Sequence, residues 1–166
     1  MKLDHDSARR LKEQILSELK QTVQKSLDMA RAAYLSDHEG AISGESKSEG
    51  KYDTRAIEAG YIAGAQKARM EELEQEMALL DEIDLDHLPQ TASVGSLLEL
   101  KTEDHSKIYF ISSTAGGTVL DVNDHKILVI SAFSPIGVEV IGLATKDEFE
   151  VEVAGQARQY EIVAIY

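Results

Sequence analysis

Two long stretches of helical periodicity with a short break between them limit what the first half of the chain can form. Apolar residues recur at steps of three and four in both stretches, which places them along one side of a helix. They are Leu11, Ile15, Leu19, Val23, Leu27, Ala30 and Tyr34, then Ala56, Ala59, Ala63, Met70, Leu73, Met77 and Leu80. A helix with so narrow an apolar stripe is unstable alone in water, so each stretch needs the other. The pattern predicts an antiparallel helical hairpin, a coiled coil, over residues 10–86.

The ends of the two helices are predicted from local signals. Asp6 or Ser7 can cap the first helix, which we expect to fade over 35–40, where Gly and acidic residues break the pattern. The break covers 36–48. The second helix is predicted to begin within 44–49, where Ser46 and Glu49 fit a capping box. Its middle is rich in Ala and Gly, which predicts a close approach of the two helix backbones.

The period changes from helix to strand near Pro89, which cannot continue a helix. Short β-rich segments separated by Gly, Asp and Asn turns follow at 96–101, 107–113, 118–122, 126–131, 149–153 and 159–166. One segment is predicted to be a short helix. Ser134 fits its N-cap, Pro135 fits the first helical position, and Gly142 fits the end of the helix. The fold class predicted is α+β, with a hairpin domain at 1–88 and an antiparallel sheet domain carrying one short helix at 89–166.

Charge and composition exclude several classes of function. The net charge is −13. Residues 1–88 carry 12 basic and 19 acidic side chains, and residues 89–166 carry 5 basic and 11 acidic ones, so both halves are acidic to a similar degree. Neither half offers the basic surface needed for direct, specific DNA binding or for binding to anionic lipid. There is no cysteine, no apolar run long enough to span a membrane and no signal-peptide pattern at the start. We therefore expect a cytoplasmic protein that does not bind membranes.

The sequence contains no enzyme motif of a hydrolase, metalloprotease or phosphate-binding loop. The five histidines lie in predicted ends and loops without the spacing of a metal site. The predicted tip of the hairpin, 36–53, is different, because Asp37, Glu39, Glu45, Glu49 and Asp53 crowd it. Two interpretations stay open: a solvated turn with a capping glutamate, or a carboxylate cluster offered to a hard cation such as Mg²⁺.

The motifs of the second half resemble a known family. The run Ile130-Ser131-Ala132-Phe133-Ser134-Pro135-Ile136-Gly137, with Ile141-Gly142 and Tyr160-Glu161-Ile162-Val163, resembles the bacterial GreA/GreB transcription elongation factors. Gly44-Glu45-Ser46-Lys47 followed by Tyr52 is similar to the start of their second coiled-coil helix. The resemblance implies an FKBP-like second domain. That domain would dock on RNA polymerase at the mouth of the secondary channel while the coil enters the channel.

The resemblance also implies roles for particular residues. Two acidic tip residues of the family help the polymerase cleave the 3′ end of backtracked RNA, holding a second Mg²⁺ of the polymerase active site. Glu45 matches the first position, where aspartate is expected. The second position is Ser48, and Glu49 lies one residue further. No cofactor of the isolated protein is implied, and RNA would be met only in the polymerase complex. Phe133, Ser134, Pro135 and Ile136 are the predicted polymerase contacts.

Other functions are compatible with the same sequence. The chain could occupy the polymerase channel and regulate transcription without stimulating cleavage, because Ser48 replaces an acid. A peptidyl-prolyl isomerase is disfavoured, since such pockets are lined by aromatic residues and the chain has no Trp and three Phe. A free-standing coiled-coil scaffold would leave the sheet domain without a role. In none of the polymerase interpretations is the chain an enzyme on its own.

Overall fold

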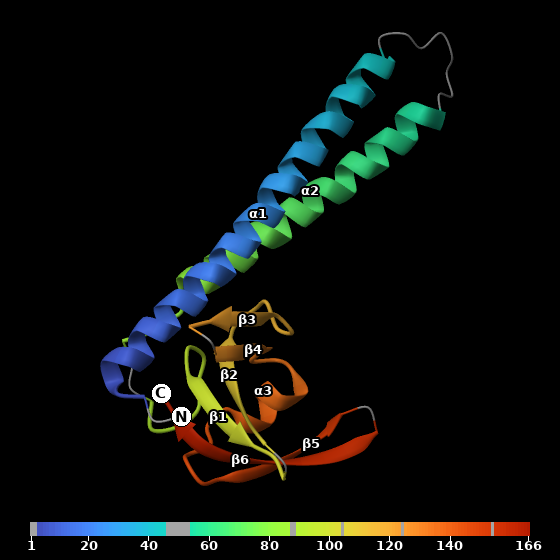
Figure 1. Ribbon diagram of the computed structural model, residues 1–166. Coiled ribbons are helices and arrows are strands. Elements are labelled where there is room, and N and C mark those ends of the chain that lie inside the picture. Colours follow the sequence, from blue (N-terminus) through green and yellow to red (C-terminus); the bar gives the residue numbers. More distant parts are fainter. Residues whose placement is uncertain (1–2, 46–53, 87–88, 104, 124, 154) are drawn as a thin grey trace. The chain divides into compact units, whose positions relative to one another are not determined.

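The computed structural model describes residues 3–45, 54–86, 89–103, 105–123, 125–153 and 155–166; within these, the side chains of 37–45, 54–56, 59 and 153 are not described. A long helical hairpin precedes a sheet with one short helix, which confirms the predicted α+β class (Figure 1). Contacts group the chain into two compact units, one of Met1–Leu19 with Leu79–Tyr166 and one of Lys20–Ala78. The domain boundary predicted between 88 and 89 adjoins residues outside the description and stays a prediction.

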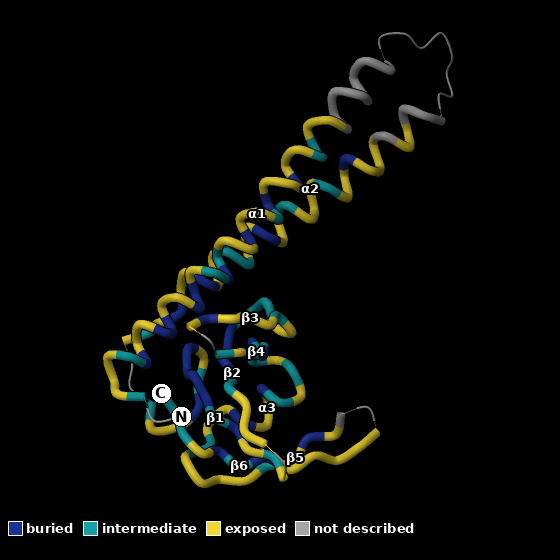
Figure 2. Tube along the Cα trace, in the orientation of Figure 1, coloured by how far each residue is buried: buried dark blue, intermediate teal, exposed yellow. Residues whose placement is uncertain are grey.

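The hairpin consists of α1 (His5–Glu45) and α2 (Thr54–Asp81). Most of the predicted apolar stripe is buried, and Figure 2 shows the buried residues recurring along both helices. The buried members are Leu11, Ile15, Leu19, Val23, Leu27, Ala30, Ala63, Leu73 and Leu80. Within Lys20–Ala78, Arg31 Nη2 lies 2.8 Å from Glu74 Oε1 and links the two helices. That pair is half exposed and contributes about 0–1 kcal/mol, so apolar burial dominates the pairing.

The predicted inner end of the first hairpin helix needs correction, and most of the predicted start of the second lies outside the described residues. The first helix does not fade over 35–40 but continues to Glu45, so Gly44 and Glu45 belong to α1 and do not begin the second helix. Gly costs only about 1 kcal/mol inside a helix, and the break contains no proline, so each further backbone hydrogen bond can still form. The second helix begins at Thr54, and the capping box predicted for Ser46 and Glu49 lies outside the described residues.

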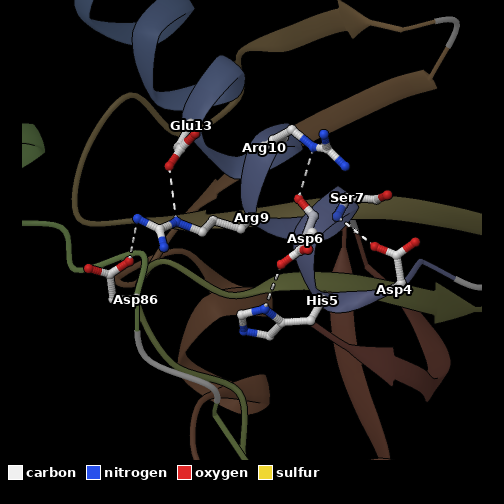
Figure 3. A network of polar contacts seen from close by, with 8 residues as sticks. All are labelled: Asp4, His5, Asp6, Ser7, Arg9, Arg10, Glu13 and Asp86. Atoms are coloured by element: carbon white, nitrogen blue, oxygen red, sulfur yellow. Dashed lines mark hydrogen bonds and ion pairs between the residues drawn. The ribbon is translucent and has the colours of Figure 1, made fainter.

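The first helix is capped earlier than predicted. Asp4 Oδ1 accepts a hydrogen bond of 2.8 Å from the Ser7 backbone N–H, so Asp4, and not Asp6 or Ser7, is the cap (Figure 3). This hydrogen bond from Ser7 lowers the pKa of the Asp4 carboxyl. Asp6 instead offers its carbonyl oxygen to Arg10 Nε at 3.2 Å. A turn later, Arg9 bonds Glu13 and also reaches Asp86 Oδ1 at 2.9 Å, joining the start of α1 to the segment after α2.

Most of the small residues of α2 whose burial is described do not lie between the helices as predicted. Gly60 and Gly64 are exposed, and a Cβ placed on either would meet nothing within 4 Å. Ala65 and Ala68 are exposed as well. Of the described small residues in this stretch, Ala63 is the one that is buried. The small side chains therefore form a solvent face of α2, and the two glycines lower the helix propensity without a packing gain.

Six strands form one sheet in the order β3-β4-β2-β1-β6-β5, which makes β3 and β5 its edges. The strands are β1 (Leu97–Lys101), β2 (Ser106–Ser112), β3 (Val119–Val122), β4 (His125–Ser131), β5 (Glu148–Val153) and β6 (Gln156–Ile165). Their positions agree with the predicted segments, but the predicted all-antiparallel pairing is wrong because β2 and β4 are parallel. After β2 the chain leaves one strand position empty, runs along β3, and returns as β4 into that position.

The helix α3 (Pro135–Val140) packs on β4 and β5. The core on this side of the sheet is one cluster of buried residues from β1, β2, β4, β5, β6 and α3, centred on side chains with almost no exposure such as Leu98, Ile111, Val140 and Ile162. The helix ends at Val140 with Ile141 as its C-cap, two residues before the predicted end at Gly142. Gly142 follows the cap and adopts φ 88°, which glycine reaches at little cost.

The ends of both hairpin helices belong to the same compact unit as the sheet. Asn123 Nδ2 donates to Gln14 Oε1 at 2.6 Å, and Ser113 Oγ donates to the Leu79 carbonyl oxygen at 3.1 Å. Lys12 is only 3% exposed in this region. Burial lowers the pKa of the Lys12 ammonium, and Asp84 and Asp86 oppose that shift. Side chains far apart in sequence thus fix the start of α1 and the end of α2 within this unit.

Replacing Gly64 by Ala is expected to stabilise the protein by about 0.5–1 kcal/mol, because the methyl group meets open space and Ala is the better helix former. Thermal or denaturant unfolding measures the change. The reverse change at exposed Ala68 in the same helix, Ala68→Gly, is the matched control and should destabilise by a similar amount. A lower Tm for Gly64→Ala would mean that this face of α2 is in close contact with another group.

Candidate docking site

The turn between β4 and α3 is held by hydrogen bonds that converge on Ser131. The Ser131 carbonyl oxygen accepts from the Ser134 backbone N–H at 2.9 Å and from Ser134 Oγ at 2.7 Å. Ser131 Oγ accepts from the Phe133 backbone N–H at 3.2 Å. The Ala132 N–H donates to the Ser112 carbonyl oxygen at 2.9 Å, which ties the turn to the neighbouring strand β2. The backbone around Phe133 is thus fixed on both sides.

Ser134 also caps α3, as the sequence predicts. Its Oγ accepts a hydrogen bond of 3.1 Å from the Gly137 backbone N–H, and Pro135 occupies the first turn, where no N–H partner is needed. One hydroxyl therefore both donates to Ser131 and accepts from Gly137. This double role explains locally why Ser and Pro stand next to each other here.

A cavity of about 500 Å³ adjoins this turn. Its walls come from three segments: the loop 113–117, the end of β4 at 128–131, and Ser134, Pro135 and Ile136. Most of the surface is apolar, and the sequence contributes no titratable side chain to it, so the cavity suits an apolar side chain rather than acid–base or metal chemistry.

Two glycines allow the cavity walls to approach each other. A Cβ on Gly116 would lie 2.8 Å from the backbone N and the Cβ of Ser131. A Cβ on Gly137 would overlap the Ser131 carbonyl oxygen and lie 2.9 Å from the backbone C and O of Ala132. In both places the obstacle includes backbone, which cannot rotate away. Glycine is therefore required where the loop and the helix meet Ser131.

Phe133 stands at the outside of this fixed turn with 85% of its surface exposed. Pro135 is exposed as well, and Val138, one turn along α3, is 61% exposed. A large aromatic side chain held in water by a rigid backbone adds nothing to folding, and such residues commonly anchor protein interfaces. Of the four predicted contact residues, Phe133 and Pro135 are exposed, and Ser134 and Ile136 are partly buried beside the cavity.

The predicted tip carboxylates cannot be placed in the same way. Glu45 is the last residue of α1, but its side chain is not described, and Glu49 and Ser48 lie outside the described residues. Their roles stay predictions. Among the described residues there is no group of three or more His, Asp or Glu that could hold a metal ion. None of the described helices is long and apolar enough to cross a membrane.

The sequence predicts the turn 131–137 but not the opposite wall of the cavity. The loop 113–117 reads in the sequence as a turn with two glycines, and nothing local indicates that Gly116 packs against Ser131. The contact depends on the parallel pairing of β2 with β4, since that pairing brings the ends of both strands to the same place.

Gly137→Ala is expected to destabilise the sheet by about 1–3 kcal/mol, because the added methyl group overlaps backbone that must move. The change in Tm or in the denaturant midpoint measures it. Val138→Ala, on the exposed side of the same short helix, should change stability by about 0.5 kcal/mol or less. Equal Tm values for both variants would contradict the close packing at Ser131.

Comparison with known proteins gives similarity at the level of structure only. No protein-family model matches the sequence, and no curated protein does. A solved structure of the transcription factor Gfh1 matches 89% of this chain and 92% of its own, with 20% identity and a TM-score of 0.40. Gfh1 of Thermus thermophilus matches 89% of this chain and 94% of its own, with 20% identity and a TM-score of 0.39. The elongation factor GreA/GreB of Nitrosomonas europaea matches 58% of this chain and 78% of its own, with 23% identity and a TM-score of 0.36. The two Gfh1 structures thus match most of this chain, and the GreA/GreB structure matches a little over half of it.

Proposed function

We propose that this chain is a Gre-like transcription factor that binds RNA polymerase at the secondary channel and modulates elongation. It acts on the polymerase in the cytoplasm and is not an enzyme alone. The observation that carries the proposal is the fixed turn of residues 131–134, which presents Phe133 to solvent within the motif that resembles the GreA/GreB factors.

The turn has the properties of a docking anchor. Its backbone is held by four hydrogen bonds, from Ala132, Phe133 and Ser134, so little conformational entropy is lost when a partner covers it. Phe133 offers a large apolar surface, and the neighbouring cavity of about 500 Å³ can receive an apolar side chain of the partner. An anchor beside a pocket is the usual geometry of an interface centre. In this proposal the partner surface belongs to the polymerase.

The hairpin supplies the second part of the proposed mechanism. Within Lys20–Ala78 the seam contains Val23, Leu27, Ala30, Ala63 and Leu73, all buried. Two helices joined by such a seam form an arm that keeps its length, as a probe of a narrow channel requires. In the proposal, this arm carries the acidic segment between α1 and α2 into the secondary channel.

Stimulation of transcript cleavage is a more specific form of this proposal. Glu45, with Glu49 as its partner, would help to hold the second Mg²⁺ of the polymerase active site and orient the attacking water at the RNA 3′ end. The alternative is a regulator that occupies the channel without cleavage. Ser48 favours this alternative, since it stands where the family resemblance calls for the second acid.

Phe133→Ala is expected to weaken binding to RNA polymerase roughly tenfold or more, because it removes the apolar anchor. A titration of the full chain against core polymerase measures the affinity. Val119→Ala is the matched control, since Val119 is a 52% exposed apolar residue of the same sheet on edge strand β3. Unchanged affinity of the Phe133 variant, or an equal loss in both variants, would reject this surface as the docking site.

Glu45→Ala is expected to abolish transcript cleavage while leaving polymerase affinity nearly intact, because docking is assigned to the sheet domain. A cleavage assay on stalled elongation complexes measures it, and added Mg²⁺ should partly restore activity if the defect is metal occupancy. If the wild type competes with an active Gre factor but cleaves nothing, the channel-occupying alternative holds, and Ser48→Glu is then the gain-of-function test. A wild type that neither cleaves nor competes would reject both polymerase functions.

A further inference from the structure

A second cavity, of about 600 Å³, lies where the β1–β2 hairpin meets strands β5 and β6. It shares no residue with the cavity beside Pro135. Its lining is mainly polar and includes Glu103, Lys107, Tyr109, Glu150, Arg158 and Tyr160. The cavity is large enough for a small organic molecule.

The floor of this cleft is formed by two tyrosines whose rings belong to the core. Tyr109 and Tyr160 are each only 5% exposed and are members of the buried cluster under α3. The Tyr160 ring also stacks on Phe149, with 5.3 Å between ring centroids and 15° between ring planes. The two rings are therefore fixed by packing before any ligand arrives.

The hydroxyl groups of these tyrosines are directed to the cleft. Neither hydroxyl has a hydrogen-bond partner among the described residues. In the described part of the chain, every fully buried side-chain oxygen or nitrogen has a hydrogen-bond partner, so these two hydroxyls are not fully buried. Both hydroxyls must therefore reach solvent, and the cavity that both residues line is where they do so. Two pre-positioned donors thus meet water at the bottom of a polar cleft.

Two cations stand at the same cleft. Lys107 and Arg158 are exposed, and within the described residues neither makes an ion pair, unlike Lys101, which lies 3.7 Å from Glu161. Burial, followed by the Tyr160 hydroxyl, raises the pKa of the Tyr109 hydroxyl, and the charge of Arg158 opposes that rise. Arg158, Tyr109 and Tyr160 line the same cavity, so the guanidinium and the two hydroxyls can donate to one ligand.

The charges around the cleft limit what it can bind. Arg158, Lys107 and the tyrosine hydroxyls at neutral pH all donate, which suits the oxygens of a phosphate or carboxylate group. Glu103 and Glu150 also line the cleft, and the chain as a whole carries −13. An extended polyanion such as nucleic acid would be repelled by the rest of the chain, whereas a small anionic ligand would meet mainly the cations of the cleft.

We propose that this cleft binds a small phosphorylated or carboxylated molecule, no larger than a mononucleotide, with its oxyanion held by Arg158 and the hydroxyls of Tyr109 and Tyr160. Lys107 adds positive charge at the mouth of the cleft. Glu103, which also lines the cleft, can accept hydrogen bonds from amino groups elsewhere on the ligand. The site is separate from the proposed docking turn, so its occupancy can be tested without polymerase.

The test is a titration of the full chain with pyrophosphate, adenosine 5′-monophosphate and citrate at about 0.15 M salt. Six tyrosines and no tryptophan make tyrosine fluorescence a usable signal, and calorimetry provides an independent one. We expect saturable binding. Response to the two phosphates but not to citrate identifies a phosphorylated ligand, and the reverse identifies a carboxylate.

Arg158→Gln should weaken that binding roughly tenfold or more, since it removes a charged donor. Tyr160→Phe keeps the ring and its stacking and should weaken binding by about three- to tenfold at unchanged Tm. Lys126→Gln removes an exposed cation of the same sheet outside the cleft and should leave binding unchanged. No saturable binding of any of the three compounds, or equal weakening by Lys126→Gln and Arg158→Gln, would overturn the proposal.

Discussion

The narrow apolar stripe of α1 is the constraint on which the hairpin depends. Its buried members run from Ala8 to Ala30 mostly at steps of three and four, while the exposed sides of the helix carry mainly charges and amides. Such a helix cannot persist alone in water, so its formation and its pairing with α2 are one event. Because the stripe begins within the unit that contains the sheet, the burial of Leu11 and Ile15 also fixes the start of the hairpin.

The features that the sequence could predict are those that depend on neighbouring residues. Hydrophobic periods located both helices and all six strands, and Ser134 with Pro135 located α3, since a cap needs only three or four residues. The inner end of α1 was predicted wrongly because Gly40 and Gly44 only weaken a helix and do not stop one. The parallel pairing of β2 and β4 and both cavities could not be predicted, because they bring together residues far apart in the chain.

The glycines also show that local sequence does not predict packing between distant segments. In the sequence, Gly60 and Gly64 stand among alanines and indicate close helix packing, yet the structure leaves open space around both. Gly116 and Gly137 carry no such signal, yet each lies against the backbone of Ser131 with no room for a methyl group. Composition cannot distinguish these cases, because the difference lies in the distance to a segment elsewhere in the chain. The candidate docking turn depends on the second kind.

The edge position of β5 has a consequence for how this protein behaves at high concentration. An open edge offers unpaired backbone groups with which a strand of another molecule can pair. Glu148, Glu150 and Glu152 alternate along β5 and are all exposed. A second copy approaching edge to edge would bring three more carboxylates alongside these, in a molecule already strongly acidic. The glutamates thus disfavour the intermolecular sheet from which fibres and aggregates grow.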